Sequence, residues 1–344
     1  MEKILKDSYD RKIDYLRLSV TDRCNLRCTY CMPEKGIRLA GREEVLTYEE
    51  LLKVVDILAQ LGIRKLRITG GEPLLRDNIL GLISGISRIE GIEKISITTN
   101  GILLSKYLEG LRQAGISGIN ISMDSLDPVK YSKITRGGQL YKVITALERA
   151  LDMGFESIKI NSVLGSFLGT GDIRDFIKWS IEKKIDIRFI EMMPVALLEE
   201  VECTSKNILK TRTHESIPAD TIFDVMKEFG EIESLKDKKG YGPAVYFKIK
   251  GAKGAIGLIR NQEESCFYCN RIRITPLGLL KLCLFSDNGL DLTRSIRHGV
   301  SEKNIKDDII MFVNKKPKSR NSNNTGCSPE DKKKIPDLMN RIGG

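Results

Sequence analysis

The sequence has little histidine and no apolar run long enough to span a membrane. Only His214 and His298 are present among 344 residues, so hydrolytic triads and histidine-rich zinc catalysts are poorly supplied. The opening MEKILKDSYD is too charged for the apolar region of a signal peptide. These absences favour a cytoplasmic protein without a membrane span.

The phosphate-loop pattern G-x-x-x-x-G-K-[ST] is also missing, so any nucleotide must be held by other means. Aromatic residues are only 6% of the chain, which leaves few platforms for stacking nucleic-acid bases. What the chain does have is positive charge, since its formal net charge is +10. This excess suits an anionic partner such as nucleic acid, a membrane surface or a phosphorylated small molecule, and charge alone does not choose among them.

Short β-rich runs recur along the first part of the chain, each followed by a helical pattern, as in consecutive βα units. The predicted strands are residues 14–20, 65–69, 94–100, 119–124, 157–163 and 187–193. The predicted helices are residues 48–61, 103–115, 140–154 and 172–184. Thr47 and Glu50 form a capping box for the first helix, and Gly62 ends it. Polar residues follow every strand, which favours an incomplete (β/α)6 TIM-like barrel over an open sheet.

The βα rhythm weakens after Met193. A helix is predicted over 220–229, and residues 241–260 alternate like antiparallel strands with glycine turns. We therefore expect three parts: a partial barrel over residues 1–219, a smaller C-terminal α+β cap over 220–314, and a flexible tail over 315–344 that ends in Gly-Gly.

Cysteine is the residue type whose placement is most informative. In a reducing compartment eight cysteines do not suggest a disulfide framework, and most of them are clustered. Two stand alone, Cys203 and Cys327, and receive no role. The others form two groups, Cys24, Cys28 and Cys31, then Cys266, Cys269 and Cys283.

Each group has three members, one short of a four-coordinate site. The first, C-x3-C-x2-C, could be buried small residues, a zinc site with a remote fourth ligand, or three corners of a [4Fe-4S] cluster with one open iron. The second, C-x2-C-x13-C, could be a zinc knuckle completed by Cys203, Cys327 or His298, or a second cluster whose free iron faces substrate. The intervening segment 270–273, N-R-I-R, adds two guanidinium groups, which match phosphate well.

The motifs resemble a known family. C-x3-C-x2-C after the first strand and G-G-E-P at 70–73 are similar to the signature of the radical S-adenosylmethionine (SAM) enzymes. With S-M-D-S-L, F-I-E-M-M-P, C-N-R-I-R-I-T and the terminal G-G, the chain is similar to the GTP 3′,8-cyclase family of molybdenum cofactor (molybdopterin) biosynthesis. The similarity runs from about Asp14 to Cys283 and resumes at the last residues.

The resemblance implies a lyase that converts GTP to 3′,8-cyclo-7,8-dihydroguanosine 5′-triphosphate in the first step of that pathway. The amino and carboxylate groups of SAM would bind the open iron of the first cluster. A 5′-deoxyadenosyl radical would take the ribose 3′ hydrogen, and the 3′ carbon would then attack C8 of guanine.

The resemblance also assigns residues position by position. Cys24, Cys28 and Cys31 would hold the SAM cluster, and Cys266, Cys269 and Cys283 a second [4Fe-4S] cluster in the cap that touches the guanine base. The SAM pocket would be lined by Tyr30, Gly71, Ser122 and Met193. GTP would be bound by Arg17, Arg67, Thr98, Lys159, Arg271, Ile272 and Arg273. The catalytic residues would be Arg17, Arg271 and Arg273, with Gly343 and Gly344 inserting into the active site.

The family further implies a flavodoxin or ferredoxin as electron donor, cyclic pyranopterin monophosphate synthase as the next enzyme, and a homodimer, with no membrane or nucleic-acid partner. The loop 165–171 departs from the family, because G-S-F-L-G-T-G replaces a more polar Gly-x-Asn stretch. Two alternatives stay open: a radical SAM enzyme that acts on a peptide or an RNA base, and a zinc-stabilised nucleic-acid-binding protein.

Overall fold

The computed structural model describes residues 4–193, 217–235, 241–286 and 288–319. His214, Cys203, Cys327, Gly343 and Gly344 lie outside the described residues. The strands of the first part are β1 (Tyr15–Ser19), β2 (Lys65–Thr69), β3 (Lys94–Thr99), β4 (Ile116–Ser122), β5 (Ser157–Leu164) and β6 (Asp186–Glu191). The later strands are β7 (Ile232–Leu235), β8 (Val245–Ile249), β9 (Ile256–Ile259), β10 (Arg271–Ile274), β11 (Leu279–Lys281) and β12 (Leu290–Asp291).

The helices alternate with the early strands and then become shorter. The first are α1 (Tyr48–Leu61), the 3-10 turn η1 (Pro73–Leu75), α2 (Ile79–Ser87), α3 (Leu104–Gln113), α4 (Pro128–Thr135), α5 (Leu140–Asp152) and α6 (Thr170–Glu182). The later ones are α7 (Asp220–Lys227), α8 (Glu264–Phe267), α9 (Leu292–Arg297) and α10 (Glu302–Val313). All six predicted strands and all predicted helices are confirmed, whereas α2 and α4 were not predicted.

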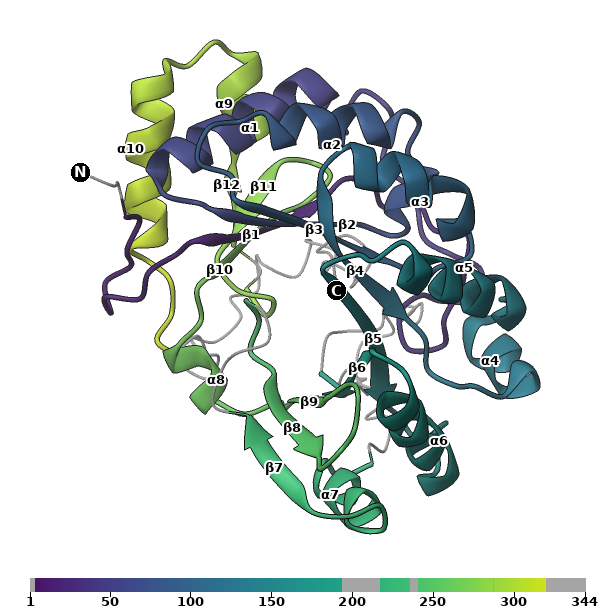
Figure 1. Ribbon diagram of the computed structural model, residues 1–344. Coiled ribbons are helices and arrows are strands. Elements are labelled where there is room, and N and C mark those ends of the chain that lie inside the picture. The colour runs from purple at the N-terminus through teal and green to yellow at the C-terminus, as the bar shows by residue number, and fades with distance from the viewer. Residues whose placement is uncertain (1–3, 194–216, 236–240, 287, 320–344) are drawn as a thin grey trace, which may run out of the picture.

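The strands form one sheet in the order β12-β11-β10-β1-β2-β3-β4-β5-β6-β9-β8-β7 within the described residues. Neighbours from β10 to β9 in this order run parallel, and the pairs at both ends are antiparallel. In Figure 1 the sheet curves round an interior, with α1, α2, α3, α5 and α6 on its outer side. The strands after residue 220 therefore extend the same sheet at both edges, β7–β9 beside β6 and β10–β12 beside β1.

Helix α1 shows how the sequence sets the elements that cover the sheet. The Thr47 hydroxyl accepts a hydrogen bond from the Glu50 amide at 3.2 Å, and the Glu50 carboxylate accepts one from the Thr47 amide at 2.8 Å. Gly62 ends the helix with φ 115°, a left-handed conformation that glycine adopts without a Cβ penalty. Such caps satisfy the orphan backbone groups at each end.

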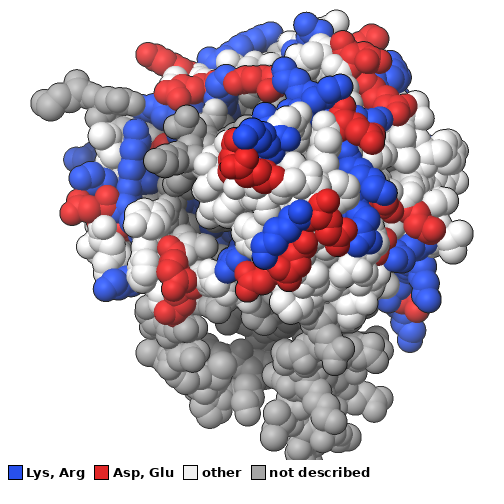
Figure 2. Space-filling view, turned by 60° about the horizontal axis from the view of Figure 1, so that its bottom comes forward, with Lys and Arg blue, Asp and Glu red and all other residues white. Residues whose placement is uncertain are grey.

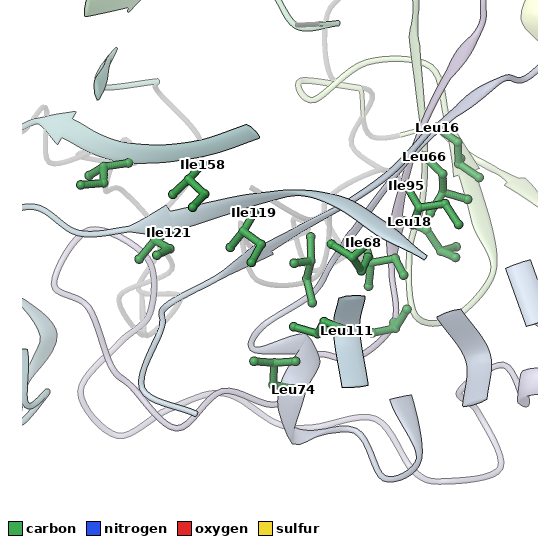
Figure 3. Packing of buried hydrophobic residues seen from close by; sticks show 14 of the residues in the cluster. Leu16, Leu18, Leu66, Ile68, Leu74, Ile95, Leu111, Ile119, Ile121 and Ile158 are labelled. Carbon is green, nitrogen blue, oxygen red and sulfur yellow. The ribbon is translucent and has the colours of Figure 1, made fainter. Parts of the chain in front are cut away.

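The core lies between the sheet and the helices, because one side of each strand is apolar. Figure 3 shows part of this core: Leu74 of η1 and Leu111 of α3 lie on the same side of the sheet as side chains from β1 to β5, of which Leu16, Leu18, Leu66, Ile68, Ile95, Ile119, Ile121 and Ile158 are labelled. Side chains alternate between the two faces of a strand, so the residues between these apolar ones face the interior of the curved sheet. On β1 those residues are Tyr15, Arg17 and Ser19.

Charge is mixed on the outside. Figure 2 shows lysine and arginine interspersed with aspartate and glutamate over the face that it displays. On that face the positive charge does not gather into one patch. In the described part of the chain, no helix has the length and hydropathy that crossing a membrane requires.

Candidate active site

The first cysteine group lies on the loop that follows β1. Cys24, Cys28 and Cys31 are half-buried, and the Cys31 amide donates to the Cys28 carbonyl at 2.9 Å. The Leu26 amide points at Cys24 Sγ at 3.4 Å, and Asn100 Nδ2 lies 3.8 Å from the same sulfur. Hydrogen bonds of this kind stabilise thiolates that bind iron.

The turn after β2 fastens this loop to the sheet. Gly71 N donates to the Thr21 carbonyl at 2.8 Å, and Glu72 N to the Arg23 carbonyl at 2.7 Å. A Cβ on Gly71 would lie 2.2 Å from the Arg23 carbonyl oxygen, so no larger residue fits there. The buried Glu72 carboxylate also accepts hydrogen bonds from Thr99 at 2.8 Å and from the Asn100 amide at 2.8 Å. The residues at the ends of β2 and β3 thereby fix the position of the loop that leads to Cys24.

The surroundings of the first group are acidic. Burial raises the pKa of Glu72 to about 7 and that of Asp124 to about 6. Burial, with the charges of Cys24 and Asp124, raises the pKa of the Cys31 thiol to about 12. A cationic group, or iron that binds the thiolates, would relieve this accumulation of negative charge.

Tyr30 lies between the first cysteine group and the end of β4. Its hydroxyl donates to Asp124 Oδ2 at 2.7 Å, and Asp124 Oδ1 accepts from the Val163 amide at 2.8 Å. Its ring stacks on Phe167, with 5.6 Å between centroids and 22° between planes. Phe167 belongs to the loop 165–171, so this loop contacts a residue of the predicted SAM pocket.

Two other predicted SAM residues lie at strand ends of the same sheet. Ser122 ends β4, and Met193 follows β6 and packs against Ala244, Tyr246 and their neighbours. Ser122 therefore lies beside Asp124, while Met193 lies against the strands that extend the sheet beyond β6.

The second cysteine group flanks the strand β10. Cys266 is in the short helix α8, Cys269 precedes β10, and Cys283 follows β11, and all three are half-buried. Burial opposes ionisation of Cys269, but the charges of Arg271 and Lys316 outweigh it and lower the pKa of this thiol to about 6. Cys269 therefore favours the thiolate form, which is the form that iron binds.

Three predicted arginines lie at one level of the inner face. Arg17 on β1 is the register partner of Arg67 on β2 and of Arg273 on β10. Adjacent strands are roughly 5 Å apart, so the three guanidinium groups project side by side. Burial and the charge of Arg273 hold the pKa of Arg17 well below its usual range, and burial with Arg271 lowers that of Arg273 to about 10.

Thr98 and Lys159 lie in a second row of the inner face. Asn120 on β4 is the register partner of both. Lys159 is 7% exposed and donates to Asp186 Oδ2 at 3.0 Å, and Thr98 Oγ1 is buried with no hydrogen-bond partner among the described residues. Ile272 is different, because its side chain is fully buried in the core on the opposite face, which leaves only its backbone at the inner face.

Arg188 and Asp124 are polar side chains of this site that the sequence reasoning missed. Arg188 on β6 is 4% exposed, donates to Asn120 Oδ1, and has its pKa lowered to about 10 by burial. Its Nε has no partner among the described residues. Strict alternation in D-I-R-F-I-E could have identified it, because Ile187 and Phe189 face the core.

The donor set suits clusters better than single ions. Within the described residues, no three His, Cys, Asp or Glu side chains converge as ligands of one metal ion. In an iron-sulfur cluster each thiolate binds a different iron, so the thiolates need not converge on one point. Two sets of three thiols, with N–H donors directed at sulfur, fit such clusters.

Comparisons with known proteins bear on these features. A radical SAM superfamily model matches residues 18–180, and a model described as Molybdenum Cofactor Synthesis C matches residues 185–322. A GTP 3′,8-cyclase of Peptoclostridium acidaminophilum is 41% identical over 344 residues, which is 100% of this chain and 99% of that protein. A GTP 3′,8-cyclase of Thermodesulfovibrio yellowstonii is 41% identical over 345 residues, with 99% and 100% covered.

Among solved structures, Streptococcus suis SuiB bound to S-adenosylmethionine is similar with a TM-score of 0.60. The match covers 89% of this chain and 69% of that chain at 13% identity. At this identity the likeness shows the fold alone, an α/β fold with a parallel sheet.

Proposed function

The chain belongs to the GTP 3′,8-cyclase family of the radical SAM superfamily, and from this premise we propose that it converts GTP to 3′,8-cyclo-7,8-dihydroguanosine 5′-triphosphate. The reaction is the first step of molybdenum cofactor biosynthesis. The family favours this function over a radical enzyme for peptides or RNA bases and over a zinc-stabilised nucleic-acid-binding protein.

One observation carries the choice of substrate: the row of Arg273, Arg17 and Arg67 beside the second cysteine group. Burying these guanidinium groups costs free energy: burial, with the charge of Arg273, lowers the pKa of Arg17, and burial, with the charge of Arg271, lowers that of Arg273. A triphosphate offsets it, because arginine binds phosphate through paired charge-assisted hydrogen bonds. Lys159, Thr98 and the backbone of Ile272 complete the proposed GTP site.

The first cysteine group is proposed to hold the cluster that binds SAM. Cys24, Cys28 and Cys31 supply three ligands, and Tyr30, Gly71, Ser122 and Met193 line the SAM pocket. When bound, SAM and this cluster supply the radical that takes a hydrogen atom from the ribose of GTP. The chain's own part is to position GTP, to neutralise its charge with Arg17, Arg271 and Arg273, and to exclude water at the buried inner face.

We read the fold as an incomplete (β/α)6 barrel over residues 1–219 with a C-terminal cap over 220–314. The cap strands β10–β12 adjoin β1, which is how Cys269 and Cys283 reach the arginine row. They are proposed, with Cys266, to hold a second [4Fe-4S] cluster that faces the base of GTP. Gly343 and Gly344, at the end of the proposed tail 315–344, are proposed to assist turnover.

The remaining partners follow from the chemistry of radical SAM enzymes. A low-potential donor such as flavodoxin or ferredoxin is proposed to reduce the first cluster, and cyclic pyranopterin monophosphate synthase to take the product. We also propose a homodimer and a cytoplasmic location, which free thiols and clusters favour.

The test is an anaerobic assay of the reconstituted protein with SAM, dithionite and GTP. The expected products are 5′-deoxyadenosine and a cyclised guanine nucleotide in equal amounts, and none of the nucleotide when ATP replaces GTP. A preparation that binds zinc without iron and sulfide, or forms 5′-deoxyadenosine with GTP unchanged, would contradict the proposal. In the second case a peptide or an RNA base becomes the substrate to test.

A further inference from the structure

Lys316 is a buried lysine at the point where the chain leaves α10. It is 3% exposed, and its Nζ donates to the carbonyl oxygen of Arg271 at 2.8 Å and to that of Leu282. Lysine is almost never fully buried unless it is paired. A buried ammonium with two carbonyl acceptors therefore needs a reason.

The two carbonyl groups belong to the chain segments that carry cysteines of the second group. Arg271 is two residues beyond Cys269, and Leu282 immediately precedes Cys283. The two segments are the open ends of the antiparallel pair β10 and β11. One ammonium group thus ties together the two strand ends from which these thiols project.

Arg11 ties the third cysteine to the same place. It is 8% exposed, and its Nη1 donates to the Cys266 carbonyl at 2.7 Å. Its Nη2 donates to the Pro317 carbonyl at 2.7 Å, and its Nη1 also to the Lys318 carbonyl at 3.1 Å. Residues directly after Lys316 are therefore fixed to the segment that carries Cys266. We call Arg11 and Lys316 the cationic clamp.

Of the two positive charges of the clamp, only that of Arg11 is paired with a carboxylate among the described residues. Asp7 pairs with Arg11 Nε at 2.6 Å, whereas no carboxylate among the described residues pairs with Lys316. Burial opposes the charge of Lys316, and so do the charges of Arg271 and Arg11, whereas the thiols of Cys269 and Cys283 support it. Three thiolates and their iron-sulfur core are a natural counter-charge for this ammonium.

We propose that the cationic clamp is a positioning device for the second cluster: it sets the spacing of the three ligand segments, and the Lys316 charge stabilises the reduced cluster. The inference rests on the second cluster of the proposed function. It adds that Pro317 and Lys318, which follow Lys316, are anchored beside that cluster.

The experiment compares Lys316→Met with the matched control Lys315→Met, in which the same substitution removes an exposed neighbouring lysine. Both are made in a Cys24→Ala background, so that only the second cluster gives a signal, and in the otherwise unchanged protein. After anaerobic reconstitution and desalting, iron and sulfide per chain are measured. The second cluster is then titrated potentiometrically and followed by electron paramagnetic resonance.

Lys316→Met is expected to lose most of the iron in the Cys24→Ala background and about half in the unchanged background, since two similar clusters share it. Whatever cluster remains should have a more negative midpoint potential, because a nearby cation stabilises the more anionic reduced state. Lys316→Arg should keep a potential near that of the parent protein, and Lys315→Met should match the parent in every measurement. If Lys316 acted only through packing, the midpoint potential would not depend on whether residue 316 carries a positive charge.

Two outcomes overturn the inference, and they are distinguishable. If the parent Cys24→Ala protein holds no cluster, the second cluster of the proposed function is wrong and the clamp falls with it. If the parent holds one and Lys316→Met keeps the same iron content and potential, only the clamp is wrong. Should Lys316→Met not fold, Arg11→Lys decides in its place: unchanged iron at the second site overturns the clamp, and lost iron supports it.

Discussion

The two cysteine groups offer three thiols each, but their electrostatic surroundings are opposite. At the first, burial raises the pKa of Cys24 and the charge of Glu72 adds to it, while burial and the charges of Cys31 and Asp124 raise that of Cys28. At the second, Arg271 and Lys316 lower the pKa of Cys269 to about 6. One cysteine group therefore lies in an acidic environment and the other in a basic one.

This difference supports the proposal that the first group lies beside SAM and the second beside GTP. SAM carries a sulfonium and an ammonium, so an acidic environment favours it. GTP carries a triphosphate, so a basic environment favours it. On the proposed function, the side chains around two equal sets of thiols would distinguish the two molecules. The following substitutions each disturb one environment and leave the other intact.

The largest effect is expected from removing a thiol in each group. Cys31→Ala should abolish SAM cleavage and lower product formation by roughly a thousandfold or more, about 4 kcal/mol in barrier. Cys283→Ala should lower cyclisation by a similar factor while the first cluster keeps its spectrum and its SAM affinity. Iron analysis, electron paramagnetic resonance and product assay check both. Wild-type cyclisation by Cys283→Ala would show that the second group is not part of the site.

The next effect concerns the arginine row. Arg273→Met and Arg67→Met should each weaken GTP binding by roughly 30- to 150-fold, since a hydrogen bond to a charged group contributes about 2–3 kcal/mol. SAM affinity should not change, because the row lies in the basic environment only. Anaerobic calorimetry measures both affinities, with Arg42→Met as the control at an exposed arginine. Equal losses of SAM and GTP affinity would contradict the separation of the two sites.

Much of the fold could be predicted because it follows from local patterns. The strands β1 to β6 follow from β-rich runs, and α1 follows from Thr47, Glu50 and Gly62. Helix α2 was missed because I-L-G-L-I-S-G-I-S contains two glycines and lacks a side-chain cap at Asn78. Helix α4 was missed although Asp127 caps it and Pro128 begins it, which is a readable signal.

The site could be predicted only in part, for a different reason. Cysteine spacing is local and specific, whereas register is a property of strands that are distant in sequence. Tyr15 pairs with Arg271 across more than half of the chain, and no pattern in either segment announces this. The predicted cap therefore gave no hint that β10 lies against β1 and forms the arginine row. Lys316 was missed because nothing in the sequence marks it as buried.

A moderate effect is expected from Glu72, which marks the acidic environment. The pKa of Glu72 is about 7 in the folded protein, whereas its ordinary value is 4.5. Between these two pH values the folded state keeps the proton and the unfolded state has lost it. The free energy of unfolding must then fall as pH rises through that window. Between pH 5 and pH 7 the loss from this group is about 2 kcal/mol.

Glu72→Gln removes that dependence, because glutamine binds no proton in this range. The measurement is anaerobic urea denaturation of the cluster-free proteins at pH 5 and pH 7. The substitution also disturbs the hydrogen bonds from Thr99 and Asn100, a cost common to both pH values. The difference between wild type and variant should therefore shift by about 2 kcal/mol in favour of the variant at pH 7. A difference that is the same at both pH values would show that Glu72 is ionised throughout.

The smallest effect is expected from the ring of Phe167, which stacks on Tyr30 beside the first cysteine group. Aromatic pairs contribute about 0.5–1.5 kcal/mol beyond their buried area, so Phe167→Leu should weaken SAM binding by roughly 2- to 10-fold. The matched substitution Phe267→Leu removes a 46% exposed ring beside the other group and should leave SAM affinity unchanged. Phe167→Tyr should restore binding, because a stacked ring is restored. If Phe167→Leu binds SAM as wild type does, Tyr30 is positioned by its hydrogen bond to Asp124 alone, and the loop 165–171 is only a neighbour of the acidic site.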